Sequence, residues 1–252
     1  MVNKNKENHI SYSTLSILID QDGFCFYLHH TNLENSFCVN KISVDDIFSL
    51  KTLKSFKKHL KEISIAYNFK NVKVAFANAY YAFVPSDYYV EDAKADYLKY
   101  NVELFEEDHI VSDHIEALNL HQVYIPLMNY HNSILEQVEE FEYQHFTNYL
   151  LQDCQPKNYE NVNFINVYVR QNSLDVIAFE GMKFKLCNTF EYKTDFDLAY
   201  YVLFAVEELK FNQTELQMNI YHDAESTSWL EILELYVKQI NCESRDLVAF
   251  IK

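Results

Sequence analysis

A repeated order of predicted strands and helices is the feature that most constrains the fold of this chain. In each half, alternating apolar residues predict three successive strands, followed by a helix and a fourth strand. The first copy has strands over 15–20, 24–29 and 36–41, a helix from Ser43 and a strand over 72–77; the second has strands over 164–169, 174–179 and 182–188, a helix from Thr194 and a strand over 216–221. This βββαβ order, used twice, indicates an internal duplication.

Both helices are predicted to begin with a capping box. Ser43-Val44-Asp45-Asp46 and Thr194-Asp195-Phe196-Asp197 each place an aspartate three residues after a hydroxyl side chain. Ser43 lies 23 residues after Asp20, and Thr194 lies 24 residues after Arg170. We therefore expect Asp20 and Arg170 at equivalent strand ends. The first helix is expected to bury one face, formed by Ile47, Leu50, Leu53, Phe56, Leu60 and Ile63.

Residues 80–155 have no counterpart in the second half and are predicted to be an insertion in the first. The pattern predicts a helix carrying Tyr97-Leu98-Lys99-Tyr100-Asn101, strands near 110–118 and 121–127, and a helix over 133–141. A polar segment containing Pro156 follows. We expect a first subdomain over residues 1–155, which includes the insertion, and a second over residues 156–252.

The last helix is predicted to begin near Ser228, where Ser228-Trp229-Leu230-Glu231 has the form of a third capping box. Its expected buried face consists of Trp229, Leu230, Leu233, Tyr236, Val237 and Ile240.

Charge and composition restrict the partners. The chain has 252 residues, a net charge of −16 and 49% hydrophobic residues, which suffice for a core without disulfides. The negative charge repels nucleic acid and anionic lipid, so neither is an expected partner. Residues 1–9 lack the apolar stretch of a signal peptide, and no run of 18 apolar residues occurs. We expect a cytoplasmic protein that is a monomer or a weak dimer.

Five cysteines, an odd number without a C-x-x-C pair, fit small buried apolar side chains in a reducing compartment. They are Cys25, Cys38, Cys154, Cys187 and Cys242.

Several segments, taken with the duplicated order, carry a resemblance to a known family. These are Ser16 to Phe26 with its D-G-F turn, Phe83-Val84-Pro85, Tyr97 to Asn101, Cys187-Asn188-Thr189-Phe190 and Tyr200-Tyr201-Val202-Leu203. The chain resembles a bacterial family described as a domain of unknown function, whose fold is similar to actin-like ATPases. The resemblance implies an α/β (α+β) class and a duplicated actin-like ATPase, or ribonuclease H-like, fold: two βββαβ-type halves with the insertion in the first. It implies a fold and no activity.

Actin-like ATPases hold nucleotide with glycine-containing turns, and this chain has only Gly23 and Gly181, where average usage would give about eighteen glycines. The turn positions of a degenerate cleft are Asp20, Asp22 and Gly23 in the first half, Asn172 and Ser173 in the second, and the segment 221–226. Asp22 stands where the family pattern has glycine, and Asp20 and Asp22 would place two carboxylates beside a triphosphate. We interpret these positions as structural turns and expect neither a bound cofactor nor catalytic residues.

Two other clusters have competing interpretations. His109 and His114 follow Glu106-Glu107-Asp108 and could hold a divalent metal, but their spacing favours a solvated acidic turn and no metal site. A lysine stripe on the first helix would be either a solvated face or a docking surface for RNA or an acidic protein. The stripe consists of Lys51, Lys54, Lys57, Lys58 and Lys61.

Tyrosine pairs at 80–81, 88–89 and 200–201 would supply either core packing or interface contacts. Because the insertion has no counterpart, we expect functional contacts there. The tyrosines expected to anchor a protein partner are Tyr88, Tyr89, Tyr97 and Tyr100.

The sequence thus favours a non-catalytic, nucleotide-independent scaffold, that is, a pseudoenzyme of bacterial origin that binds a protein. The alternative is a divergent actin-like ATPase or kinase with an altered nucleotide cleft. No G-x-S-x-G or H-E-x-x-H motif supports a hydrolase.

Overall fold

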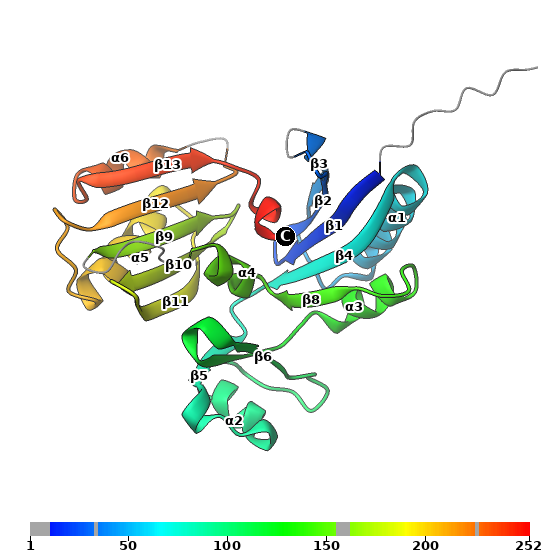
Figure 1. Cartoon of the computed structure of the whole chain (residues 1–252), viewed down its shortest axis with the longest axis horizontal. Coiled ribbons are helices and arrows are strands. Elements are labelled where there is room, and N and C mark those ends of the chain that lie inside the picture. Colours follow the sequence, from blue (N-terminus) through cyan, green and yellow to red (C-terminus); the bar gives the residue numbers. More distant parts are fainter. Residues whose placement is uncertain (1–10, 33–34, 155–161, 225–226) are drawn as a thin grey trace, which may run out of the picture. The chain divides into compact units, whose positions relative to one another are not determined.

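The computed structural model describes residues 11–32, 35–154, 162–224 and 227–252. Within these ranges it contains two five-stranded sheets and one three-stranded sheet (Figure 1). The described residues divide into two compact units. The first comprises the described residues up to Phe76, Pro126–Gln144 and Ile251–Lys252, and the second comprises Ala77–Ile125 and His145–Phe250 as far as they are described.

The sheet of the first unit has the order β3-β2-β1-β4-β8. Its strands are β1 (Ser11–Asp20), β2 (Gly23–His29), β3 (Phe37–Ser43), β4 (Asn68–Ala77) and β8 (Glu142–His145). Helix α1 (Leu50–Ala66) packs Phe56, Leu60 and Ile63 against apolar side chains of β1 and β2. The predicted meander and fourth strand are therefore confirmed.

The predicted start of the first helix at Ser43 is wrong. Ser43 is the last residue of β3 and pairs with Gly23 of β2, so strand pairing extends past the predicted cap. The helix is capped instead by Ser49, whose hydroxyl accepts the N–H of Thr52 at 3.1 Å. Leu50, predicted to be buried, stands in the first turn and is exposed.

The sheet of the second unit repeats the arrangement, with the order β11-β10-β9-β12-β13. Its strands are β9 (Asn163–Val169), β10 (Ser173–Glu180), β11 (Lys183–Glu191), β12 (Gln217–His222) and β13 (Gln239–Ser244). In both sheets the first strand of the half lies between the second and the fourth. Asp20 is the last residue of β1, and Arg170 directly follows β9 at the matching end. The repeated βββαβ order predicted from the sequence thus corresponds to a repeated topology.

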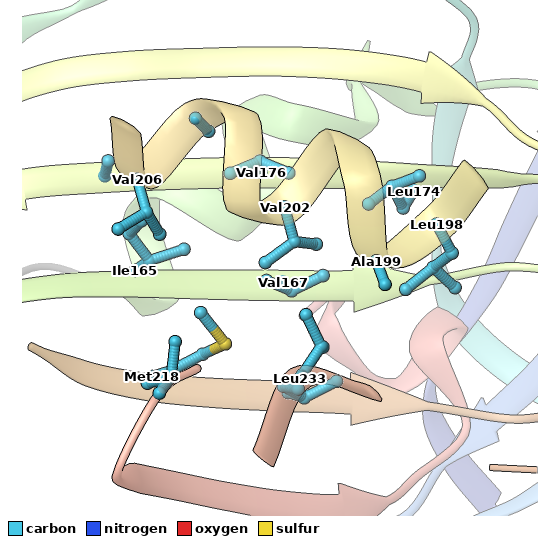
Figure 2. Packing of buried hydrophobic residues seen from close by; sticks show 14 of the residues in the cluster. Ile165, Val167, Leu174, Val176, Leu198, Ala199, Val202, Val206, Met218 and Leu233 are labelled. Atoms are coloured by element: carbon cyan, nitrogen blue, oxygen red, sulfur yellow. The ribbon is translucent and has the colours of Figure 1, made fainter. Parts of the chain in front are cut away.

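Helix α5 (Asp195–Glu208) covers one face of this sheet. Figure 2 shows Leu198, Ala199, Val202 and Val206 directed toward β9 and β10, where Ile165, Val167, Leu174 and Val176 lie. The predicted capping box at Thr194 is confirmed: its hydroxyl accepts the N–H of Asp197, whose carboxylate accepts the N–H of Thr194.

The last helix, α6 (Ser228–Glu234), is shorter than predicted. Its N-cap is Thr227, without a side-chain hydrogen bond, so the predicted capping box at Ser228 is wrong. Trp229 and Leu233 are buried as expected. Ile240 belongs to β13, where it pairs with Met218 of β12, because the chain turns back into the sheet after Val237.

The first part of the predicted insertion, residues 81–124, forms the three-stranded sheet β5-β7-β6, whereas β8, also within residues 80–155, belongs to the sheet of the first unit. The strands of the three-stranded sheet are β5 (Tyr81–Pro85), β6 (Val111–Ile115) and β7 (Leu120–Tyr124), and the short helix α2 (Lys94–Leu98) packs on them. Val84, Leu98 and Val123 form a small core. The two predicted strands are confirmed, and β5 is an additional one.

The helix predicted over 133–141 lies earlier in the chain. The structure has α3 (Met128–Leu135), followed by β8 and then α4 (Phe146–Asp153). The strand β8 was missed because its four residues are too short for alternation to be evident.

The subdomain boundary between residues 155 and 156 stays a prediction, because residues 155–161, including Pro156, lie outside the described residues. All five cysteines are described: Cys25, Cys154 and Cys187 are buried, and the sulfurs of Cys25 and Cys38 lie 3.3 Å apart. Among the described residues, no helix has the length and apolar character needed to cross a membrane.

Candidate functional site

The first predicted cleft turn is a two-residue hairpin between β1 and β2, in which Asp20 pairs with Gly23. The Asp20 carboxylate accepts the backbone N–H of Asp22 at 2.9 Å, and the Asp22 carbonyl accepts the N–H of Val44 at 2.8 Å. Phosphate-binding turns present such N–H groups to the ligand. Here the N–H of Asp22 donates its hydrogen bond to the Asp20 carboxylate of the same turn.

Gly23 is required by backbone packing. Its φ is +151°, and a Cβ at this position would lie 1.9 Å from the carbonyl oxygen of Ile42 on β3. The glycine therefore permits close approach of β2 and β3, which is a structural role in strand pairing.

At the second predicted turn, between β9 and β10, the side chain of Arg170 makes contacts within the hairpin. Its guanidinium forms a buried ion pair with Asp175 and donates from Nε to the Ser173 hydroxyl at 3.0 Å. The Asn172 carbonyl accepts the N–H of Tyr192 at 2.9 Å. Asn172 and Ser173 thus take part in contacts within the second unit.

The third predicted turn is only partly described, since Glu225 and Ser226 lie outside the described residues. In the described part, the His222 carbonyl accepts the N–H of Arg245 at 2.7 Å, which connects β12 to the residue after β13.

Two of the four predicted interface tyrosines are prominent on the surface of the insertion. Tyr88 is 75% exposed and Tyr100 is 84% exposed. Val90 and Phe105 of the same insertion are also exposed. The insertion thus exposes four large apolar side chains between residues 88 and 105.

The other two tyrosines support this surface. The Tyr97 hydroxyl donates to the carbonyl of Tyr88 at 2.8 Å and accepts the N–H of Val90 at 2.9 Å. The Tyr89 ring stacks on His121 at 3.7 Å, and its hydroxyl contacts Glu91 and Ser112. Partial burial and the Glu91 hydrogen bond raise the pKa of Tyr89. Tyr89 and Tyr97 therefore hold the segment that carries Tyr88.

The remaining tyrosine pairs divide between core and surface. Tyr81 on β5 is buried, and burial raises its pKa well above the ordinary value. Tyr200 is exposed, and its neighbour Tyr201 stacks on Phe190. The pair at 200–201 lies on α5.

The two histidines that were considered as metal ligands have different positions in the fold. His109 precedes β6, whereas His114 on β6 pairs across the sheet with His121 on β7, with ring centroids 4.6 Å apart. Within the described ranges, no three His, Cys, Asp or Glu side chains are grouped so that they could hold a metal ion.

The lysine stripe lies on α1 and is partly neutralised. Lys57 forms an ion pair with Glu136 at 2.6 Å, and Lys58 with Glu62 at 3.8 Å. Lys51, Lys54 and Lys61 are exposed.

A buried series of hydrogen bonds between polar groups in the second unit was not predicted. Gln122 donates to the Thr147 hydroxyl at 2.6 Å, which donates to His145 Nδ1 at 2.7 Å, and His145 Nε2 donates to the Asn78 carbonyl at 3.0 Å. Burial lowers the pKa of His145 to about 3, so the imidazole is neutral. Gln122 lies on β7, Thr147 on α4, His145 at the end of β8 and Asn78 directly after β4. Their separation in sequence left no motif to find.

A family model described as "Protein of unknown function (DUF3822)" matches residues 3–240 of this chain. The chain belongs to the DUF3822 family. Among curated proteins, no match to this DUF3822 member was found.

Two of the solved structures that are similar to this DUF3822 chain cover nearly all of it. One is a Bacteroides thetaiotaomicron protein with an actin-like ATPase fold and unknown function: 21% identity, TM-score 0.77, covering 96% of this chain and 94% of that one. The other is the PilM-PilN type IV pilus biogenesis complex: 9% identity, TM-score 0.64, covering 95% of this chain and 90% of that one. The DUF3822 chain therefore has an actin-like ATPase fold with two mixed α/β halves, as the resemblance implied.

Proposed function

We propose that this protein is a non-catalytic, nucleotide-independent binding or scaffolding protein that contacts a protein partner through its insertion. The observation that carries the proposal is the exposure of Tyr88 and Tyr100, 75% and 84%, together with the contacts of Tyr89 and Tyr97 that hold the segment carrying Tyr88. Tyrosines are enriched at interfaces, where a few anchors supply most of the binding free energy. An anchor whose backbone is already fixed loses little entropy on binding.

Nucleotide independence is supported by the turn at Asp20. A phosphate there would have to displace the Asp20 carboxylate from the Asp22 N–H, and it would meet the charges of both aspartates. The fold is compatible with a protein-binding role, since one similar structure is a complex of PilM with PilN.

The interface is tested by affinity capture from a native cell extract. Wild type is compared with Tyr88→Ala/Tyr100→Ala and with a control, Leu50→Ala/Ile65→Ala, which removes two equally exposed apolar side chains from α1. We expect the first variant alone to lose the captured protein, with an unchanged melting temperature. Equal recovery of the same protein by all three would refute this interface.

Nucleotide independence is tested separately. We expect millimolar ATP, ADP or GTP with magnesium to leave the melting temperature unchanged. A ligand at 100 times its Kd would add about 2.7 kcal/mol, equivalent to several degrees. A shift of that size, abolished by Asp20→Ala, would replace the scaffold proposal with the nucleotide-binding alternative.

A further inference from the structure

Helix α5 carries an aromatic stripe on the side that faces away from the sheet. Phe196, Tyr200 and Phe204 are 75%, 60% and 42% exposed, and the rings of Tyr200 and Phe204 stack with centroids 5.8 Å apart. Their spacing of four residues places them in one row, roughly 12 Å long at about 1.5 Å per residue. The opposite side of α5 is fully used by the sheet core (Figure 2). The stripe is therefore apolar surface that the second unit does not need for its own packing.

The charged side chains within α5 and its neighbour α6 are all acidic. Helix α6 packs against α5, and the Ser228 hydroxyl at its start donates to Asp195. Neither α5 nor α6 contains lysine or arginine. Both helices expose glutamates, at positions Glu207, Glu208, Glu231 and Glu234. Lys193 and Lys210 lie just outside the two ends of α5.

We propose that the α5 stripe binds a basic amphipathic helix of a partner protein. A helix with apolar residues at spacings of three and four would cover Phe196, Tyr200 and Phe204, while its lysines or arginines would face the glutamates. The aromatic rings would add cation–π contacts.

The same charges argue against other occupants. A second copy of this chain would place glutamate against glutamate in a protein of net charge −16, and an anionic membrane would be repelled. This proposal stands on residues separate from the insertion surface and does not depend on it.

The test uses a synthetic 18-residue helix of leucine and lysine, with the leucines on one face and a fluorescent label. A scrambled peptide of the same composition is the control. Fluorescence anisotropy should give a Kd at least tenfold weaker for the scrambled peptide, and binding should weaken between 50 and 300 mM salt. No binding of the amphipathic peptide, or equal binding of the two peptides, would overturn the proposal.

The site is located with two sets of variants. Phe196→Ser/Tyr200→Ser/Phe204→Ser should weaken binding at least tenfold, and Glu207→Gln/Glu208→Gln should weaken it less and reduce its salt dependence. Leu50→Ser/Ile65→Ser, which changes two exposed apolar side chains of α1, is the matched control and should leave the Kd within twofold. Equal losses in the aromatic triple variant and in this control would refute the location. Sedimentation of wild type, but not of the triple variant, with phosphatidylserine vesicles would assign the stripe to a membrane and overturn the proposal.

Discussion

Arg170 and Asp175 form an ion pair in which the two side chains are only 4% and 1% exposed. Arg170 follows β9 and Asp175 lies on β10, so the pair closes this hairpin from within. Asp175 also accepts the hydroxyl of Thr189 on β11 at 2.7 Å, which extends the contact to a third strand.

Replacing one partner should be costly because it leaves the other charge buried. We expect Arg170→Met to lower the free energy of unfolding by about 3–5 kcal/mol, measured by urea denaturation. The double variant Arg170→Met/Asp175→Leu should lose less, since no unpaired charge remains. A loss below about 1 kcal/mol for Arg170→Met would contradict this account.

Stability should fall with acidification because of His145. Its folded-state pKa is about 3, below the unfolded value, so its contribution is fully present above about pH 6.5 and is lost as the pH falls toward 3. The loss should approach roughly 1.4 kcal/mol per pH unit in that window.

Denaturation at several pH values checks this prediction. In His145→Gln the slope of the free energy of unfolding between pH 6 and 4 should decrease relative to wild type. Identical slopes in the two proteins would show that His145 does not contribute.

The two glycines should differ in their tolerance of side chains. Gly23→Ala should destabilise the protein by roughly 3 kcal/mol or more, because strained φ and overpacking each cost about 1–3 kcal/mol. Gly181 has φ +56°, a left-handed conformation that asparagine accepts, so Gly181→Asn should cost under about 1 kcal/mol. Equal melting temperatures of the two variants would refute the packing role of Gly23.

The N-cap residues of α5 and α6 should also differ. Thr194→Ala should lower stability by about 1 kcal/mol because it removes the acceptor for the N–H of Asp197. Thr227 makes no side-chain cap hydrogen bond, so Thr227→Ala is the matched control. Thermal unfolding followed by circular dichroism distinguishes them, and a larger loss in Thr227→Ala would contradict the assignment of the caps.

The repeated topology could be predicted from the sequence because alternation along β1, β2, β9 and β10 reflects burial of these strands. Ser43 shows the limit of local patterns. Its S-x-x-D motif competes with pairing to Gly23 across the sheet, and the pairing determines where β3 ends. Local spacing does not report such a cross-strand contact.

Some of the candidate functional residues could likewise be predicted from the sequence, and others could not. Of the four tyrosines chosen from the sequence, Tyr88 and Tyr100 are exposed and Tyr89 and Tyr97 are half-buried, and their role in an interface stays a prediction. The chain from Gln122 through Thr147 and His145 to Asn78 was not predictable, because folding alone brings its members together. The row of Phe196, Tyr200 and Phe204 had a readable signal, aromatic residues at every fourth position of a predicted helix.

Residues 251 and 252 belong to the first unit, although most of that unit lies before residue 77. The Ser16 hydroxyl donates to the Ile251 carbonyl at 2.6 Å, and Lys73 donates to the Lys252 carbonyl at 2.7 Å. During synthesis, β1 to β4 emerge from the ribosome long before these two residues exist. The first unit must therefore wait for the entire second unit to be translated before its last contacts can form, so its completion is a late event in folding.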